Sequence, residues 1–177
     1  MHYSILLLLV IMNTTTVKML HDFNKNDDLS AWTIVNDGVM GGLSKGNISI
    51  NGEGHGEFSG YISLENNGGF SSLRTRFAPL SVVAFQKIII RVKGDGKRYQ
   101  LRVKTDTYDA HSYITYFTTS GQWEEIELDL ETFYPSFRGR KLAMSNYPKL
   151  EMEELAFLIA NKKEESFLLQ IDYIQLK

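Results

Sequence analysis

The chain has 177 residues, 43% of them apolar and 12% aromatic, a length and composition typical of one folded domain with a sizeable core. Its net charge of −2, from 19 basic and 21 acidic residues, provides no overall electrostatic drive toward nucleic acid. The absence of cysteine excludes disulfides, thiolate metal sites and a cysteine nucleophile.

The N-terminus begins with an apolar run, Ile5 to Met12, which is far shorter than the ~20 residues that span a bilayer. It suits the core of a signal peptide, although no Lys or Arg precedes it and no small-x-small cleavage pattern follows. We therefore expect residues 1–20 to be a leader or a disordered apolar terminus and residues 21–177 to form a single domain. An exported location, periplasmic or membrane-associated, is favoured over a cytoplasmic one.

An oxygen-rich segment follows, with Asp22, Asn24, Asn26 and Asp27 close together. Short polar side chains of this kind form turns by bonding to nearby backbone amides, and this is the favoured interpretation. A bound calcium ion is the alternative that the residues leave open. Spacings typical of other metal sites are absent, so we predict no metal site and no cofactor.

The rest of the chain alternates apolar and polar residues with a period of two, as half-buried strands do. Segments of this kind occur at residues 47–50, 57–64, 70–77, 88–92, 98–104, 111–118, 123–130 and 167–176. Helix is scarce, with a single turn expected within Lys149 to Leu155, and we predict less than about a fifth of the chain in helix. The number and spacing of these strands predict an all-β fold, an antiparallel sandwich or jelly roll.

Two of the predicted strands, residues 88–92 and 98–104, flank the turn-forming segment Gly94-Asp95-Gly96-Lys97, which predicts a hairpin. The second strand places Tyr99, Leu101 and Val103 on one face. Its other face carries Arg98, Arg102 and Lys104, which we interpret as a solvated face of the sheet.

The most distinctive segments are two glycine-rich loops, Asn36-Asp37-Gly38-Val39-Met40-Gly41-Gly42 and Asn66-Asn67-Gly68-Gly69-Phe70. Glycine allows tight turns and close approach of another segment, so these loops are expected to have fixed shapes at one edge of the β structure. We expect Trp32 and Phe70 to anchor them to the core. Neither loop ends in the Gly-Lys-Ser/Thr of a phosphate loop, which argues against a nucleotide site.

Catalytic patterns are likewise absent. None of the four histidines lies beside a nucleophile turn, and the densest acidic cluster, at residues 124–129, reads as the solvated face of one strand. The sequence therefore predicts a binding module and not an enzyme. A hydrolase that uses Asp37 with Glu65 remains the weaker alternative.

Five motifs in order resemble a known family, the thirty-kilodalton NADH:ubiquinone oxidoreductase complex I intermediate-associated proteins. The resemblance extends from about residue 23 to the C-terminus and rests on the two glycine-rich loops, Gly94-Asp95-Gly96-Lys97, Trp123, and Tyr134-Pro135-Ser136-Phe137-Arg138-Gly139-Arg140. It implies a galactose-binding-like jelly roll and a protein partner, an assembly intermediate of respiratory complex I. The Leu-rich leader in place of an Arg/Ser-rich presequence suggests a bacterial relative.

Within these motifs the candidate binding residues are Asp37, Asn66, Asn67, Arg138 and Arg140, while Gly38, Gly41, Gly42, Gly68 and Gly69 shape the loops. The short polar side chains of Asp37, Asn66 and Asn67 can bond backbone amides within the loops. We expect Asp37, Asn67 and Arg138 to meet at one rim of the sandwich, with an Asp37–Arg138 ion pair. The alternative to a protein partner is a carbohydrate, bound on the polar face of the sandwich by Arg91, Arg102 and Tyr116.

Overall fold

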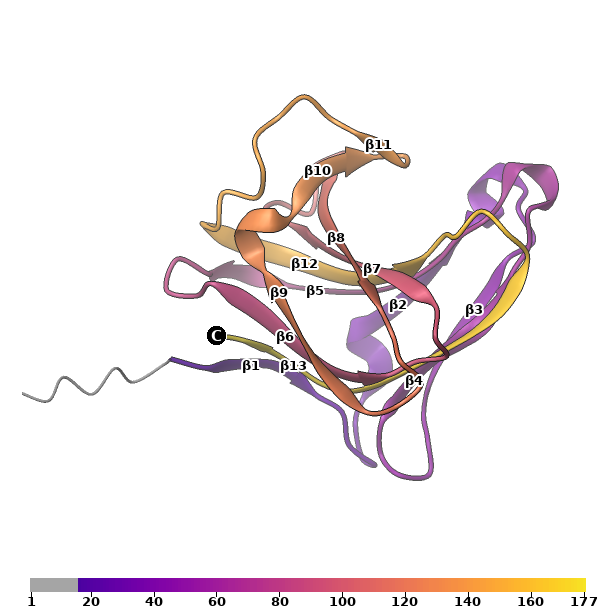
Figure 1. Cartoon of the computed structure of the whole chain (residues 1–177), viewed down its shortest axis with the longest axis horizontal. Helices are drawn as coiled ribbons and strands as arrows, with labels where there is room; N and C mark the ends of the chain where they lie inside the picture. Colours follow the sequence, from indigo (N-terminus) through magenta and orange to yellow (C-terminus); the bar gives the residue numbers. More distant parts are fainter. Residues whose placement is uncertain (1–15) are drawn as a thin grey trace, which may run out of the picture.

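Two antiparallel β-sheets pack face to face in the computed structural model, which describes residues 16–177 (Figure 1). Residues 1–15 of the predicted leader lie outside the described residues. The first strand begins at Lys18, so the folded domain starts ahead of the predicted residue 21. The all-β sandwich predicted from the alternating segments is confirmed. Helix within residues 16–177 is confined to four 3₁₀ segments: η1 (Leu29–Ala31), η2 (Asp37–Met40), η3 (Glu65–Asn67) and η4 (Leu130–Thr132).

The sheet that contains the first and last strands, sheet A, has six strands in the order β3-β4-β13-β6-β9, with β1 paired to β13. Its strands are β1 (Lys18–Asp22), β3 (Lys45–Ile50), β4 (Gly56–Ile62), β6 (Lys87–Lys93), β9 (Glu124–Asp129) and β13 (Glu165–Leu176).

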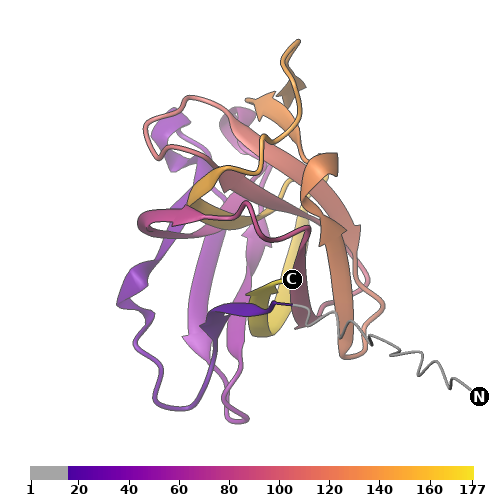
Figure 2. The same cartoon turned by 90° about the vertical axis from the view of Figure 1, so that its left-hand side faces the viewer.

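The opposite sheet, sheet B, has seven strands in the order β11-β10-β8-β7-β12-β5-β2. They are β2 (Trp32–Asn36), β5 (Ser71–Ser81), β7 (Arg98–Lys104), β8 (Ser112–Thr118), β10 (Tyr134–Phe137), β11 (Arg140–Lys141) and β12 (Glu151–Ile159). The short β10–β11 hairpin rises above the outer face of this sheet, as the two views show (Figures 1 and 2).

Large apolar side chains from both inner faces fill the space between the sheets. Phe58 and Ile90 point in from sheet A, and Leu73, Tyr99 and Phe157 from sheet B, all fully buried. Burial of this apolar area is the main favourable contribution to folding. It also fixes the register of each strand, because a shift of one residue would turn the apolar side chains outward.

The predicted hairpin between residues 88–92 and 98–104 is wrong, because β6 and β7 lie in different sheets. The four residues between the strands can extend up to about 14 Å, enough to cross the ~10 Å between packed sheets. Asp95 holds this crossing: it accepts hydrogen bonds from Lys97 Nζ at 2.6 Å, Tyr99 Oη at 2.8 Å and the Leu168 backbone N at 3.0 Å. A glycine turn between two alternating segments fits a hairpin and a crossing equally well.

The helical turn predicted within residues 149–155 is also wrong, since β12, an interior strand of sheet B, begins at Glu151. Every residue from Glu154 to Ile159 is buried, so the strand lacks the clear alternation of a half-exposed one. Glu154 is accommodated by an ion pair with Arg76 on β5, with 2.8 Å from Nε to Oε2.

Asp37 joins two further crossings between the sheets. The η2 loop leads from β2 in sheet B to β3 in sheet A, and the η3 loop leads back from β4 to β5. The Asp37 carboxylate lies between them and accepts hydrogen bonds from Ser44 on one side and from Gly69 and Phe70 on the other. Both loops pack tightly against it, and a Cβ added to Gly42 would lie 2.3 Å from Asp37 Oδ1.

We predict that Gly42→Ala destabilises the protein by about 1–3 kcal/mol, the usual range for overpacking. The added methyl group would displace a carboxylate that its hydrogen bonds hold in place. Urea unfolding measures the change. The matched control is Gly38→Ala in the same loop, where a Cβ meets nothing within 4 Å, and it should leave stability within about 0.5 kcal/mol. Equal losses in the two variants would contradict the tight packing around Asp37.

Candidate functional site

Asp37 is buried, with 3% of its surface exposed, and both of its carboxylate oxygens are occupied by donors from its own loops. Oδ1 accepts from the Ser44 backbone N at 3.1 Å. Oδ2 accepts from Ser44 Oγ at 2.5 Å and from the backbone N atoms of Gly69 and Phe70 at 2.5 and 3.2 Å. The expectation that this side chain bonds backbone amides within the loops is confirmed.

Ionisation of Asp37 is favoured by these contacts. Burial by itself raises the pKa of a carboxyl group, but the hydrogen bonds from Ser44, Gly69 and Phe70 outweigh it and lower the pKa of Asp37 below its usual value. The charged form is therefore the one that holds the two loops together. A carboxylate held in this way fixes the path of the two loop backbones. Glu65, which the hydrolase alternative pairs with Asp37, is exposed in η3.

The predicted asparagines shape the second loop. Asn66 and Asn67 have left-handed backbone conformations, with φ of 55° and 59°, which asparagine tolerates better than most residues. The Asn66 Nδ2 donates to the Gly41 carbonyl at 2.9 Å and so joins this loop to the first one.

The predicted ion pair between Asp37 and Arg138 is wrong. Among residues 16–177, the partners of Asp37 are the loop donors described above, and the Arg138 guanidinium lies 5.2 Å from the centre of the Phe137 ring. Both oxygens of the Asp37 carboxylate already accept hydrogen bonds from the two loops, and these bonds stabilise its charge without a cation from the β10–β11 turn. The two regions are nevertheless neighbours, because Phe70 and Arg138 line the same groove.

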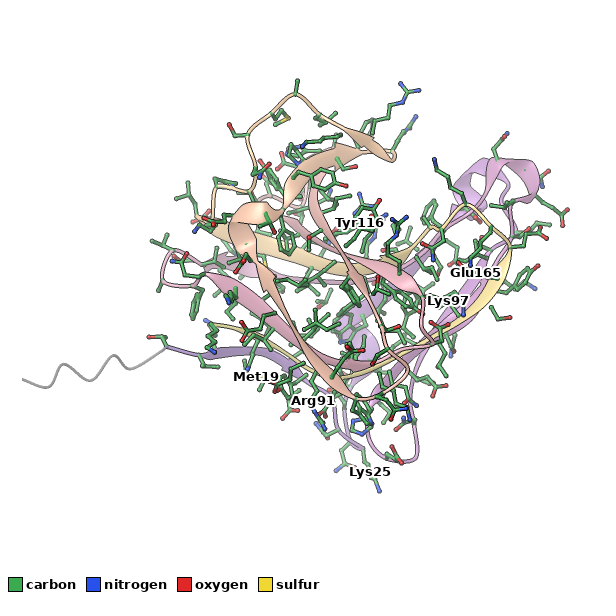
Figure 3. All side chains as sticks on the ribbon, viewed as in Figure 1. Met19, Lys25, Arg91, Lys97, Tyr116 and Glu165 are labelled. Carbon is green, nitrogen blue, oxygen red and sulfur yellow. The ribbon has the colours of Figure 1, made fainter. Side chains whose placement is uncertain are left out.

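That groove lies on the outer face of sheet B and has a volume of about 440 Å³, within the range of ligand-binding sites. The β10–β11 hairpin borders it on one side and the glycine-rich loop at Phe70 on another. Figure 3 shows Tyr116, which contributes to its wall, on the side of sheet B that faces the hairpin. Cations and aromatic rings dominate the lining: Arg74, Arg102, Lys104, Arg138, Lys141, Phe70, Tyr116, Tyr134 and Phe137.

The strand register explains why these side chains meet. Arg74 on β5 pairs with Ala156 on β12, which pairs with Arg102 on β7, and Arg102 pairs with Ile114 on β8. Paired residues point to the same face of a sheet, so this row crosses the floor of the groove. The neighbouring row brings Gln100 beside Tyr116, where the Gln100 Nε2 donates to the tyrosine oxygen at 3.3 Å.

Burial lowers the pKa of two cations in the groove. Burial, together with the nearby Arg74 charge, lowers the pKa of Arg102 to about 10, although Glu154 acts in the opposite direction. Burial likewise lowers the pKa of Lys104. The solvated face predicted for Arg98, Arg102 and Lys104 is therefore correct only for Arg98, which is exposed, because the other two are half-buried in the groove.

Two predicted binding residues lie elsewhere. Arg91 is on β6 of sheet A, on the opposite side of the molecule from Tyr116, where it pairs with Asp172 and stacks on Trp123 (Figure 3). The expected grouping of Arg91 with Arg102 and Tyr116 on one polar face is wrong, since the β6–β7 segment crosses between sheets. Arg140 is exposed on β11 and is not part of the groove lining.

Phe70 differs from its expected role. Trp32 is buried and anchors β2 to the core, as predicted, whereas Phe70 is half-buried and lines the groove. Arg74, Gln100 and Tyr134 also line it and were not among the predicted residues. The alternation in residues 98–104 predicts that Gln100 and Arg102 lie on the same face of their strand. The presence of Arg74 and Tyr134 in the same groove follows only from the order of strands in sheet B.

The oxygen-rich segment at residues 22–27 folds as the favoured turn. The Asn24 Oδ1 accepts from the Asn26 backbone N at 3.0 Å, and Asp27 pairs with His21 at 2.6 Å. Among residues 16–177, no three His, Asp or Glu side chains come together in a way that could hold a metal ion. No helix within the same residues is both long and apolar enough to cross a membrane.

Comparison with known proteins gives two findings. The family model for complex I intermediate-associated protein 30 matches residues 21–171. The mitochondrial complex I intermediate-associated protein 30 of Mus musculus is 24% identical in an alignment 184 positions long, which covers 89% of this chain and 55% of the mouse protein. This chain thus spans about half the length of that relative.

Solved structures with the same fold include carbohydrate-binding modules. The family 11 module of the Clostridium thermocellum cellulase Lic26A-Cel5E has a TM-score of 0.65 at 16% identity, covering 92% of this chain and 95% of the module. A family 11 module from Clostridium thermocellum in complex with a β-1,3-1,4-mixed-linked tetrasaccharide has a TM-score of 0.63 at 18% identity, covering 90% of this chain and 94% of that one. At these identities the likeness shows a shared jelly-roll fold.

The lowered pKa of Asp37 leads to a pH-dependent prediction. A carboxyl group whose pKa is lower in the folded state stabilises the protein above its unfolded pKa, and this stabilisation is lost as the pH falls through the folded value. Asp37→Asn should cost about 2–4 kcal/mol at pH 7, because an amide presents a donor to the Gly69 and Phe70 N–H groups. The deficit should shrink below about pH 4.

Urea unfolding at several pH values measures this difference between the wild type and Asp37→Asn. The control is Asp106→Asn, at an exposed carboxylate that accepts one bond from the Tyr108 backbone N, and it should change stability by less than about 0.5 kcal/mol. A deficit for Asp37→Asn that stays constant down to pH 3 would show that the charge of Asp37 is not what stabilises the loops.

Proposed function

This chain belongs to the complex I intermediate-associated protein 30 family, and from that premise we propose that it is a non-enzymatic binding module. Its partner would be a protein, an intermediate in the assembly of respiratory complex I, and the groove on sheet B would be the surface that binds it. The family description and the name of the mouse relative support this choice of partner.

The observation that carries the proposal is the groove itself. It is an indentation of about 440 Å³ whose lining combines aromatic rings with cations. Tyrosine and arginine are enriched at the energetic centres of protein interfaces because each combines a large contact area with hydrogen bonding. Tyr116, with 40% of its surface exposed, is available for such a contact.

The chemistry of the lining supports binding over catalysis. Within the described part of the chain, the groove is lined by no Asp, Glu or His side chain, the groups that most often act as general acid or base. Asp37, the candidate of the hydrolase alternative, uses both of its oxygens to hold the loops. A site of this composition can bind and orient a ligand.

Carbohydrate binding is the second candidate, and the fold favours it. The structural relative with a TM-score of 0.63 was solved with a mixed-linked tetrasaccharide. Tyr116, Tyr134 and Gln100 provide the aromatic and amide groups with which a sugar can form contacts. A carbohydrate would bind in the same groove as the protein partner, so the two proposed functions differ only in the chemistry of the ligand.

Tyr116→Ala tests the proposed function in the cells that produce the protein. Deletion of the gene should reduce the amount of fully assembled complex I on native gels, and the wild-type chain should restore it. Tyr116→Ala should restore less than about a tenth, as expected when a central interface tyrosine is lost. The matched control, Tyr108→Ala, removes a tyrosine that is 95% exposed outside the groove, and it should restore assembly fully.

Normal assembly of complex I in the absence of the protein would contradict the proposed function. If in addition the purified protein binds a mixed-linked β-glucan with micromolar affinity, and Tyr116→Ala abolishes that binding, the carbohydrate candidate replaces it.

A further inference from the structure

Two arginines on the same face of sheet B line the groove. Arg74 on β5 and Arg102 on β7 are both register partners of Ala156 on the strand between them. Two strand spacings place their backbones roughly 10 Å apart. Ala156 itself is buried, with 2% of its surface exposed, and the groove is lined by Arg74 and Arg102 on either side of it. A ligand group that enters the groove can therefore contact both arginine side chains.

These two positive charges have no carboxylate partner among residues 16–177. Glu154, two residues before Ala156 on β12, is buried and forms its ion pair with Arg76. Arg74 instead donates from Nε to Ser72 Oγ at 3.2 Å. Arg102, with its pKa lowered to about 10 chiefly by burial, remains charged at neutral pH. Two half-buried like charges side by side are unfavourable unless an anion joins them.

The aromatic rings of the groove also bear cations. The Arg98 guanidinium carbon lies 4.5 Å from the centre of the Tyr116 ring, Lys141 Nζ lies 5.1 Å from that of Tyr134, and Arg138 lies 5.2 Å from that of Phe137. A sugar stacks on an open ring face, but here one face of each of these rings is taken by a positive charge. The rings thus hold cations in place around the groove, an arrangement that suits an anionic ligand better than a neutral sugar.

Gln100 provides a second, independent sign of a ligand. Only 8% of its surface is exposed, and its Oε1 atom is buried with no hydrogen-bond partner among the described residues. A buried acceptor without a donor costs free energy, so a ligand that supplies an N–H or O–H group there gains affinity. Gln100 and Arg102 are alternate residues of β7 on one face, about 7 Å apart, which equals the repeat between alternate residues of an extended peptide.

We propose that the groove binds an extended, acidic segment of polypeptide. A Glu or Asp carboxylate of the segment lies between Arg74 and Arg102, and a backbone N–H of the segment donates to Gln100 Oε1. Arg138 and Lys141, at the rim of the groove, attract further acidic residues of the same segment. This inference rests on the proposed function, which assigns the groove to a protein partner, and it specifies the chemistry of that partner.

Binding of a fluorescein-labelled oligoglutamate to the purified full chain, followed by anisotropy, tests the inference. The wild type should bind it, and more weakly as salt is added, because salt screens the attraction between charges. Arg102→Gln and Arg74→Gln should each weaken binding at least tenfold, and Arg102→Lys should weaken it less because it keeps the charge. The control, Arg91→Gln, removes the same charge from sheet A and should change affinity less than twofold.

Three outcomes would overturn the inference. Oligoglutamate binding that Arg102→Gln and Arg74→Gln leave unchanged would mean that the attraction is not located in the groove. Binding of polygalacturonate or a mixed-linked β-glucan without binding of oligoglutamate would assign the groove to a saccharide. Full restoration of complex I assembly by Arg102→Gln, with loss of restoration by Tyr116→Ala, would reject the acidic ligand while the proposed function stands.

Discussion

The ionised carboxylate of Asp37 is the interaction on which both halves of the sandwich depend. Its hydrogen bonds reach Ser44, which leads into sheet A, and Gly69 and Phe70, which lead into sheet B. One side chain thereby fixes two crossings between the sheets. Because the Phe70 backbone is held by Asp37 while its side chain lines the groove, the same charge connects the scaffold to the proposed binding surface. Asp95 fixes the β6–β7 crossing in the same way. In both places a carboxylate that accepts several hydrogen bonds fixes the path of the chain between the sheets.

The protein has a net charge of −2, but its charged residues are distributed unevenly over the structure. Five of its basic residues line one groove, while Asp37, Asp95 and Glu154 are each engaged in contacts that shape or stabilise the sheets. Net charge therefore says little about what this surface attracts, because the local field near a concave wall depends on the side chains that line it. The shared jelly-roll fold supplies the concave outer face, and the side chains of this chain decide the ligand that it can hold.

Much of the fold follows from local pattern. Alternating segments identified most strands, and the glycine-rich loops identified Asp37 as a residue that bonds backbone amides. Pattern failed where pairing depends on distant residues: Gly94-Asp95-Gly96-Lys97 fits a hairpin locally, yet β6 pairs with β13 and β9. The same limit explains the error for Arg91, which shares a predicted hairpin with Arg102 but lies in the other sheet. The residues of the groove come from six strands and the loops that connect them, so only the strand order and register reveal Arg74, Ala156 and Arg102 as one row.

The central claim is that the outer face of sheet B is the binding surface. An NMR titration of the isotope-labelled protein with oligoglutamate tests it most directly, because each amide reports its own surroundings. The account predicts that the largest shift changes occur at the Gln100 side-chain amide and at backbone amides of β7, β8 and the β10–β11 turn, with little change in sheet A. Shift changes that concentrate on β4, β6 and β13 instead would place the ligand on the opposite face of the sandwich and contradict the account.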